Sequence, residues 1–202
     1  MFLKSPPELI LASTSRYRRE LLNRLGTPFV CEAPNVDEAS LPGERAQALV
    51  VRLARAKAEA VATRHPDAWV IGSDQVAVRL DAADGEVILG KPGTVAACIE
   101  QLKGCSGQSV SFVTAVALTQ KLSGSLTEFT DITRVAFRML DDASIERYVE
   151  RESPLDCAGG FKSEALGISL CESVNSTDPT ALIGLPLIRL AAALRTAGFQ
   201  LP

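Results

Sequence analysis

Apolar and polar residues alternate along the chain in a way that predicts a strand, a turn and a helix near the N-terminus. The run Leu9–Ala12 is short and wholly apolar, as in a buried strand. Three hydroxyl residues follow at Ser13–Ser15, and Leu21, Leu22 and Leu25 then recur at helical spacing. A hydroxyl directly before such a stripe is a usual N-terminal cap of a helix.

The clearest helical pattern runs from Glu44 to Arg64. Apolar residues at positions 46, 49, 50, 53, 60 and 61 form one stripe, and Lys57 falls on the same stripe. A lysine on an otherwise buried face either extends its ammonium group outward or directs it into a cleft. The spacing leaves both alternatives open.

The remaining pattern mixes strands with helices. Trp69–Ile71 indicates a central strand that ends at Gly72-Ser73-Asp74, so we expect Asp74 at the carboxyl end of a strand, where α/β proteins often place catalytic groups. Further strands are expected at Val76–Leu80, Val87–Leu89, Ser109–Thr119 and Thr127–Leu140, with a hairpin turn at Asp84-Gly85, and helices at Thr94–Gly104, Ala143–Glu150 and Pro186–Ala197. This order predicts an α/β protein with a mixed sheet flanked by helices.

Composition is that of an ordinary globular enzyme. The 202 residues are 47% hydrophobic and 22% charged, which is enough for a sizeable core. A net charge of −3 argues against broad binding to nucleic acid or membrane surfaces. No apolar stretch approaches the roughly 20 residues that span a bilayer, and Met1–Lys4 leads into prolines rather than into a signal-peptide core. Five scattered cysteines without a CxxC motif favour the cytoplasm.

The chain contains one histidine, His65, which precedes a proline at the end of the long predicted helix. A single histidine in that place excludes Ser-His-Asp, Cys-His and histidine–metal chemistry. Any catalysis must therefore use carboxylates, lysines, arginines and hydroxyls.

Arg16, Arg18 and Arg19 lie in the first turn of the helix predicted near the N-terminus. A helix N-terminus already carries free N–H groups and partial positive charge, so arginines there oppose the dipole. An anion bound at the turn would relieve this repulsion, and the pattern therefore predicts a phosphate site. A basic, solvated first turn is the alternative, and the spacing of a Walker A loop is absent.

The same segment, Ala-Ser-x-Ser-x-x-Arg-Arg after an apolar strand, resembles the N-terminal signature of the Maf family of nucleotide pyrophosphatases. Similar motifs follow in the family's order at Val36–Glu38, Ile71–Gln75, Gly90–Pro92, Ala158–Glu164 and Ile183–Pro186. The resemblance covers nearly the whole chain. It implies a single domain over residues 1–202, with an elongated Maf/ITPase-like α/β fold in which two lobes flank a central cleft.

The resemblance also implies residue roles. Asp74, which on the residues alone could equally be a turn aspartate, matches the family's proton acceptor for the attacking water. Glu38 matches an acidic position that, with Asp74, holds a divalent cation, Mg²⁺ or Mn²⁺. Lys57 and Lys91 match catalytic lysines that stabilise charge on the leaving pyrophosphate. The residues expected to bind substrate in the phosphate-binding turn are Ser13, Ser15, Arg18 and Arg19.

Three positions are expected to read the base: Tyr17, Gln75 and Glu164. The family branch that acts on dTTP and UTP typically has arginine, threonine and glutamine at these positions. The base pocket of this chain is therefore about two charge units more negative than the base pocket of that branch. The cationic ring of 7-methylguanine favours a carboxylate and an aromatic face over an arginine. Arg16-Tyr17 stands where the 7-methyl-GTP branch usually has Pro-Trp, and packing of Tyr17 on its own helix is the alternative.

The expected function is hydrolysis of 7-methyl-GTP to 7-methyl-GMP and pyrophosphate. The alternatives are a pyrophosphatase for dTTP, UTP or another modified nucleotide, and a non-catalytic nucleotide sensor in cell-division control. The presence of Glu38, Lys57, Asp74 and Lys91 together favours an enzyme. The partner expected is a nucleoside triphosphate substrate, without nucleic acid or membrane, and a homodimer stays open.

Overall fold

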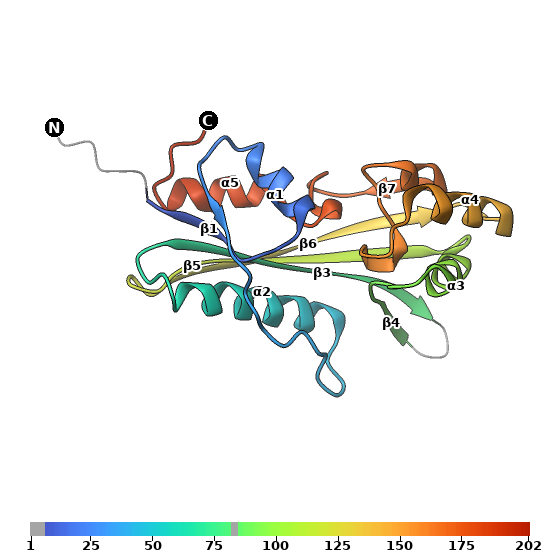
Figure 1. Cartoon of the computed structure of the whole chain (residues 1–202), viewed down its shortest axis with the longest axis horizontal. Helices are drawn as coiled ribbons and strands as arrows, with labels where there is room; N and C mark the ends of the chain where they lie inside the picture. The colour runs from blue at the N-terminus through green and yellow to red at the C-terminus, as the bar shows by residue number, and fades with distance from the viewer. Residues whose placement is uncertain (1–6, 82–84) are drawn as a thin grey trace. The chain divides into compact units, whose positions relative to one another are not determined.

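The computed structural model describes residues 7–81 and 85–202 (Figure 1). These residues divide into two compact units. The first contains the described residues up to Asp74 together with Thr114–Thr130 and Gly184–Pro202, and the second contains Gln75–Val113 and Asp131–Ile183. The Met1–Lys4 segment and Asp84 of the expected hairpin turn lie outside the described residues.

Seven strands of the described residues form one mixed sheet, which confirms the prediction. The strand order is β2 (Val30–Cys31), β1 (Leu9–Leu11), β3 (Trp69–Asp81), β5 (Ser109–Gln120), β6 (Ser125–Phe137) and β7 (Cys171–Asn175), with β4 (Gly85–Leu89) paired to β3. β1 is parallel to β2 and β3, whereas β4 is antiparallel to β3 and β7 is antiparallel to β6. The sequence did not predict β2 and β7, because both are short, largely exposed strands without an apolar pattern.

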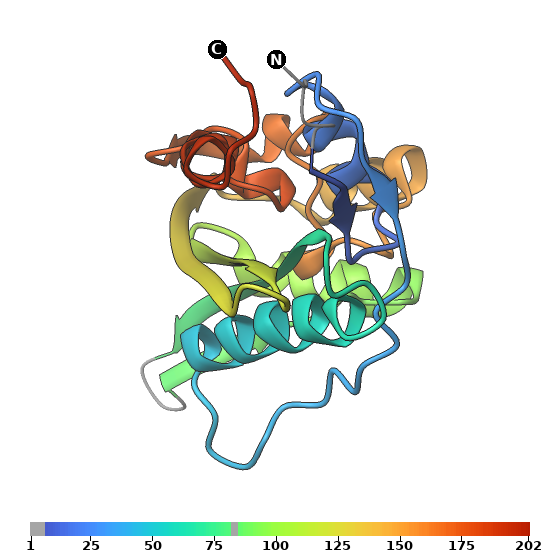
Figure 2. The same cartoon turned by 90° about the vertical axis from the view of Figure 1, so that its left-hand side faces the viewer.

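Helices cover both faces of the sheet in the first unit. α1 (Arg16–Asn23) and α5 (Leu187–Thr196) lie on one face, and α2 (Ala46–Ala62) lies on the other (Figures 1 and 2). Ser15 caps α1 by accepting a hydrogen bond from the backbone nitrogen of Arg18. Because both faces are covered, β1 is buried along its whole length, as its apolar run predicts.

α2 lies directly against β3 at Gly72. A Cβ atom at this position would be 2.1 Å from the carbonyl oxygen of Ala54 and 2.6 Å from the backbone nitrogen of Ala58. Only glycine therefore permits this close approach. Since side chains alternate along a strand, Asp74 shares the face of Gly72 toward α2, and Ser73 lies on the opposite face.

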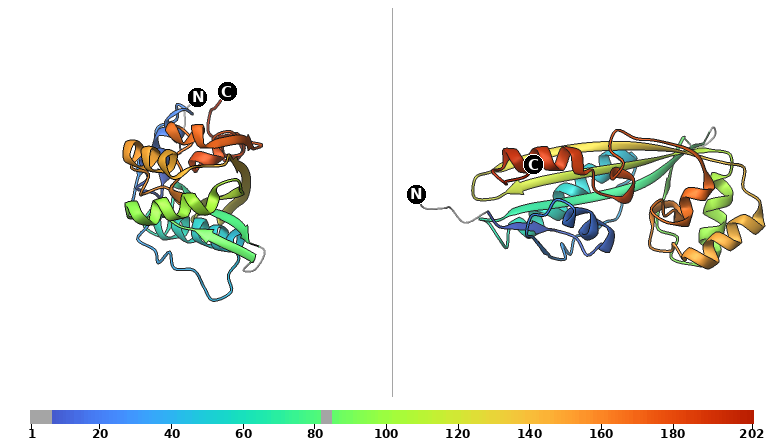
Figure 3. Two further views of the ribbon diagram at one scale, coloured as in Figure 1. Left: turned by 90° about the vertical axis from the view of Figure 1, so that its right-hand side faces the viewer. Right: turned by 90° about the horizontal axis from the view of Figure 1, so that it is seen from above.

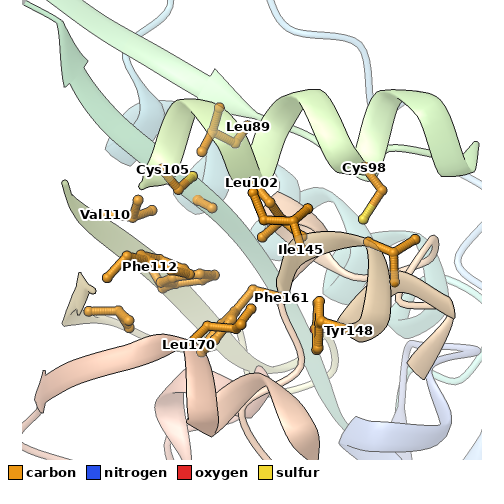
Figure 4. Packing of buried hydrophobic residues seen from close by; sticks show 14 of the residues in the cluster. Leu89, Cys98, Leu102, Cys105, Val110, Phe112, Ile145, Tyr148, Phe161 and Leu170 are labelled. Carbon is orange, nitrogen blue, oxygen red and sulfur yellow. The ribbon is translucent and has the colours of Figure 1, made fainter. Parts of the chain in front are cut away.

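The second unit has a hydrophobic core of its own. α3 (Val95–Cys105) and α4 (Asp142–Glu152) pack side by side (Figure 3). Phe161 packs in this core near Phe112 (Figure 4), with 5.6 Å between the ring centroids. The ring centroid of Phe137 lies 5.1 Å from that of Phe161. The described residues also include short 3₁₀ helices at Ala158–Gly160, Leu166–Leu170 and Ala181–Ile183. None of the described helices is long and apolar enough to cross a membrane.

One expectation about the site is wrong: Asp74 does not lie at the end of a strand. β3 continues from Trp69 to Asp81 without a break, because the residues beyond Asp74 are largely buried and those from Ala77 onward pair with β4. What ends near Asp74 is the pairing of β3 with β1, which stops at Ile71. Asp74 is therefore held on both sides by regular strand backbone, beyond the end of a neighbouring strand.

Candidate active site

Two serines hold the turn between β1 and α1. The Oγ of Ser13 accepts a hydrogen bond from the backbone nitrogen of Ser15 at 3.1 Å, and the Oγ of Ser15 accepts from the backbone nitrogen of Arg18 at 3.4 Å. The first turn of α1 contains no acidic residue. The positive end of the helix dipole is therefore not neutralised by a carboxylate of its own first turn, which leaves it suited to an external anion.

Arg18, on α1, lies within electrostatic range of two carboxylates of the first unit. Its Nε donates a hydrogen bond to the carbonyl oxygen of Gly184 at 3.1 Å. Burial lowers the pKa of Arg18, while the negative charges of Asp74 and Glu38 act in the opposite direction. An arginine stays protonated under such a shift, so Arg18 places a positive charge within electrostatic range of both carboxylates.

Gly184 connects α1 with β3. Its carbonyl oxygen accepts hydrogen bonds from Arg18 Nε and, at 3.0 Å, from the Oγ of Ser73. Its φ of +116° is unfavourable for other residues, and a Cβ would be 3.4 Å from Arg18 Nε. Ser73 and Gly184 lie in motifs that the sequence analysis noted without assigning them a role. The structure gives them one, because together they fix the position of Arg18.

Lys57 lies between two carboxylates. Its Nζ is 2.7 Å from Oδ1 of Asp74 and 2.9 Å from Oε1 of Glu38. Lys57 and Asp74 are only 4% and 6% exposed, whereas 55% of the Glu38 side chain is accessible. Of the two alternatives for a lysine on an apolar stripe, the structure therefore shows the inward one. The ammonium group offsets the mutual repulsion of the two carboxylates.

Hydrogen bonds attach the loop that carries Glu38 to α2. Arg52 donates to both carboxylate oxygens of Glu44, each at 2.7 Å, and to the carbonyl oxygen of Ala39 at 3.0 Å. Glu44 also accepts from the backbone nitrogen of Leu41 at 3.0 Å. These hydrogen bonds lower the pKa of Glu44 to about 2, and the bonds from Arg52 have the largest effect. The helical pattern expected from Glu44 to Arg64 did not indicate this ion pair, because in the structure α2 begins at Ala46 and Glu44 belongs to the loop before it.

The first unit thus brings together two cations, Arg18 and Lys57, and two carboxylates, Glu38 and Asp74. An ionised carboxylate can accept a proton, and the cations can bind phosphate oxygens. Among the described residues no group of three or more histidine, cysteine or acidic side chains is arranged to hold a metal ion. A pair of carboxylates nevertheless fits Mg²⁺, which usually takes one or two carboxylates and completes its shell with water and substrate phosphates.

Two other expected residues are placed differently. Arg19 is exposed, and its charge acts on Cys31, although burial raises the pKa of that thiol overall. Lys91, in the second unit, is exposed in the loop after β4 and forms no ion pair with any residue that the structure describes. Neither contributes to the ion pairs of Lys57.

Tyr17 is half-buried and contacts its neighbour. Its hydroxyl accepts a hydrogen bond from Arg16 at 2.6 Å, and the guanidinium carbon of Arg16 lies 4.7 Å from the ring centroid. The ring therefore already holds a cation in the geometry of a cation–π contact.

The other two residues expected to read the base lie in the second unit. The amide nitrogen of Gln75 donates to the carbonyl oxygens of Ala181 and Leu182, at 2.9 and 3.1 Å. Gln75 therefore holds a 3₁₀ helix in place. Glu164 is exposed, and one of its carboxylate oxygens lies 3.5 Å from the Oγ of Ser163.

Comparisons with known proteins identify similar chains. The model of the family described as "Maf-like protein" matches residues 8–197. The chain is 55% identical over 196 residues to the 7-methyl-GTP pyrophosphatase of Xanthomonas campestris pv. campestris (strain 8004), covering 97% of this chain and 99% of the relative. The protein of that name from Aromatoleum aromaticum is 55% identical over 195 residues, 96% of this chain and 98% of the relative. A solved structure, the Staphylococcus aureus Ham1 protein, matches at a TM-score of 0.47 and 18% identity, over 64% of this chain and 71% of that chain.

The buried ion pair generates a stability prediction. Lys57→Met leaves the carboxylate of Asp74 buried beside an apolar side chain, which should lower the free energy of unfolding by about 3–5 kcal/mol. In a double-mutant cycle, Lys57→Met combined with Asp74→Asn should cost clearly less than the sum of the single substitutions. Urea unfolding of the four proteins measures both quantities.

Arg55→Met is the matched control, because it removes an ion pair from the same helix in a more exposed place. Arg55 pairs with Glu128, and 47% of the Arg55 side chain is accessible. Its loss should cost about 1 kcal/mol or less. If Lys57→Met and Arg55→Met lowered the free energy of unfolding by the same amount, the buried pair would have no special role in stability.

Proposed function

Because this chain belongs to the Maf family, we propose that it hydrolyses 7-methyl-GTP to 7-methyl-GMP and pyrophosphate. Relatives that are 55% identical to it over nearly their full length carry the name 7-methyl-GTP pyrophosphatase. The observation that carries the chemistry is the buried ion pair of Lys57 with Asp74, flanked by Glu38 and Arg18. Action on free nucleotides, rather than on nucleic acid, and a cytoplasmic location are part of the same proposal.

The reaction sets two demands on this cluster. A water molecule must lose a proton as its oxygen bonds to phosphorus, and the anhydride bond between the α- and β-phosphates must break so that pyrophosphate leaves with the bonding electrons. In our proposal Asp74, whose Oδ1 lies 2.7 Å from the Nζ of Lys57, accepts the proton. Arg18 and Lys57 then stabilise the negative charge that grows on pyrophosphate. For Lys91, a residue of the second unit, the same role stays a prediction.

Phosphate binding would use the turn between β1 and α1. The Ser13 and Ser15 side chains fix this turn, and the N-terminus of α1 offers backbone N–H groups and a positive dipole end. Arg19, on the exposed side of the same helix, adds longer-range attraction for a triphosphate.

We further propose a divalent cation, Mg²⁺ or Mn²⁺, as the cofactor. Glu38 and Asp74 would hold it, because both supply hard carboxylate oxygens. The two carboxylates are close together, since both form an ion pair with the ammonium group of Lys57. When bound, such an ion neutralises triphosphate charge and lowers the pKa of coordinated water. Glu38 is the more accessible of the two carboxylates and could therefore be reached by a cation from solvent.

Preference for a methylated base would come from charge. The base of 7-methyl-GTP is cationic, and the proposed readers are the ring of Tyr17 and the exposed carboxylate of Glu164. In the structure Arg16 occupies the ring of Tyr17, so a cationic base either uses the other face or replaces that guanidinium group. Gln75 contributes by holding the Ala181–Ile183 helix rather than through a free amide nitrogen.

A substrate panel tests the proposed function. Release of pyrophosphate should show a higher kcat/KM for 7-methyl-GTP than for GTP, dTTP or UTP. Glu164→Gln should reduce the preference over GTP by roughly two- to fivefold, the range for an exposed ion pair. Glu172→Gln, which neutralises another exposed glutamate of the second unit, should leave the preference unchanged.

Preference of the native protein for dTTP or UTP would place it in the other branch of the family. Release of single orthophosphates would indicate a phosphatase, and binding without turnover of any nucleotide would indicate a sensor.

The assignment of the proton acceptor can be tested separately. Asp74→Asn keeps the size of the side chain but removes the basic oxygen, so kcat should fall by roughly 10² or more while nucleotide binding persists. Turnover and binding by calorimetry measure the two effects. Near-normal turnover would reduce Asp74 to a structural partner of Lys57.

The metal assignment predicts loss of activity in excess EDTA and recovery with Mg²⁺ or Mn²⁺. Glu38→Gln should raise the Mg²⁺ concentration required for half-maximal activity. Asp37→Asn is the control, because Asp37 accepts a hydrogen bond from the backbone nitrogen of Ala39 and does not contact Lys57. Full turnover in the chelator would exclude the proposed cofactor.

A further inference from the structure

The second unit contains a pocket between α4 and the 3₁₀ helix Leu166–Leu170. Its volume is about 130 Å³. None of the residues expected at the active site lines it. Its polar lining consists of three arginines and two serines, together with Tyr148: Arg138, Arg147, Arg151, Ser144 and Ser169.

One wall of the pocket is a single face of α4. Ser144, Arg147, Tyr148 and Arg151 recur at i, i+3, i+4 and i+7, the spacing that aligns side chains along a helix. The third arginine, Arg138, follows β6 and completes the cationic lining from another element.

The three guanidinium groups of this pocket form no ion pair within the part of the chain that the structure describes. Arg138 donates to the backbone carbonyls of Ser169 and Met139, at 3.0 and 3.1 Å, and Arg147 donates to the hydroxyl of Ser144 at 3.0 Å. All of these acceptors are neutral. Like charges gathered in this way repel one another unless an anion is bound between them.

The positive charges of Arg147 and Arg138 act on the nearby carboxylate of Asp141. Its pKa is lowered, first by the hydrogen bond from the backbone nitrogen of Ser144 and further by the charges of Arg147 and Arg138. Asp141 already serves as the N-terminal cap of α4. Among the residues that the structure describes, the pocket is lined by three arginines and by no acidic residue. Of the carboxylates beside it, Asp141 is held by the backbone nitrogen of Ser144, and Glu152 pairs with Lys162 and accepts from the backbone nitrogen of Leu166.

We propose that this pocket binds a small phosphate anion, inorganic phosphate or pyrophosphate, through residues that take no part in the candidate active site. Guanidinium groups offer paired N–H donors that match phosphate oxygens. Sites for drug-sized ligands usually measure about 300–1,000 Å³, so a pocket of this size suits a free anion rather than a nucleoside. The inference is independent of the proposed function.

The test is a titration of the ¹⁵N-labelled full chain with sodium phosphate, and separately with sodium pyrophosphate, followed by two-dimensional NMR at constant ionic strength. Amide signals of Ser144, Arg147 and Ser169 should shift and saturate. The double variant Arg147→Gln/Arg151→Gln should weaken this binding by roughly tenfold to a hundredfold, the range for charged hydrogen bonds. Arg134→Gln, which removes an exposed arginine of the same unit outside the pocket, should leave it unchanged.

Three results would overturn the proposal. Shifts confined to Ser13–Arg19 would mean that phosphate binds only at the candidate active site. Equal shifts with sodium chloride would indicate general screening of charge. Much tighter binding of AMP than of phosphate at these amides would contradict a site for free anions. The titration of the native protein decides the matter even if the double variant does not fold.

Discussion

The ammonium group of Lys57 is the interaction on which the candidate site depends. It is buried, and its partners come from a loop at Glu38 and from a strand at Asp74. Removing such charges from water is costly unless they are paired, so α2, the loop and β3 must reach their positions together. Gly72 allows α2 to approach the strand, and the Glu44–Arg52 ion pair attaches the loop to the same helix. The same placement of α2, β3 and the loop therefore provides both the close packing at Gly72 and the ion pairs of Lys57.

The two faces of β3 carry different parts of the site. The face toward α2 carries Gly72 and Asp74, and it supplies the close packing and the carboxylate. The opposite face carries Ser73, which holds the carbonyl of Gly184 and, through it, Arg18. A single strand thus carries the Asp74 carboxylate itself and positions the Arg18 guanidinium group through Ser73 and Gly184.

Local periodicity predicted most of the elements but not their partners. The serine cap of α1 and the apolar stripe of α2 could be found because they depend on residues a few positions apart. The length of β3 could not, since Gly72 and Ser73 are common turn residues and the strand continues only because of its neighbours in the sheet. For Lys57 the spacing gave the face of the helix, whereas the two carboxylates that explain its burial lie 19 and 17 residues away.

The alternation of side chains along β3 also restricts how this sequence can evolve. A substitution at Ser73 or at Asp74 affects the partner on its own face of the strand. Insertion or deletion of one residue between Trp69 and Asp74 would exchange the faces of everything that follows. The carboxylate would then be directed toward the Gly184 carbonyl, which repels it, and Lys57 would lose its buried partner. Descendants of this sequence should therefore vary in the length of their surface loops while this short stretch of strand keeps its residue count.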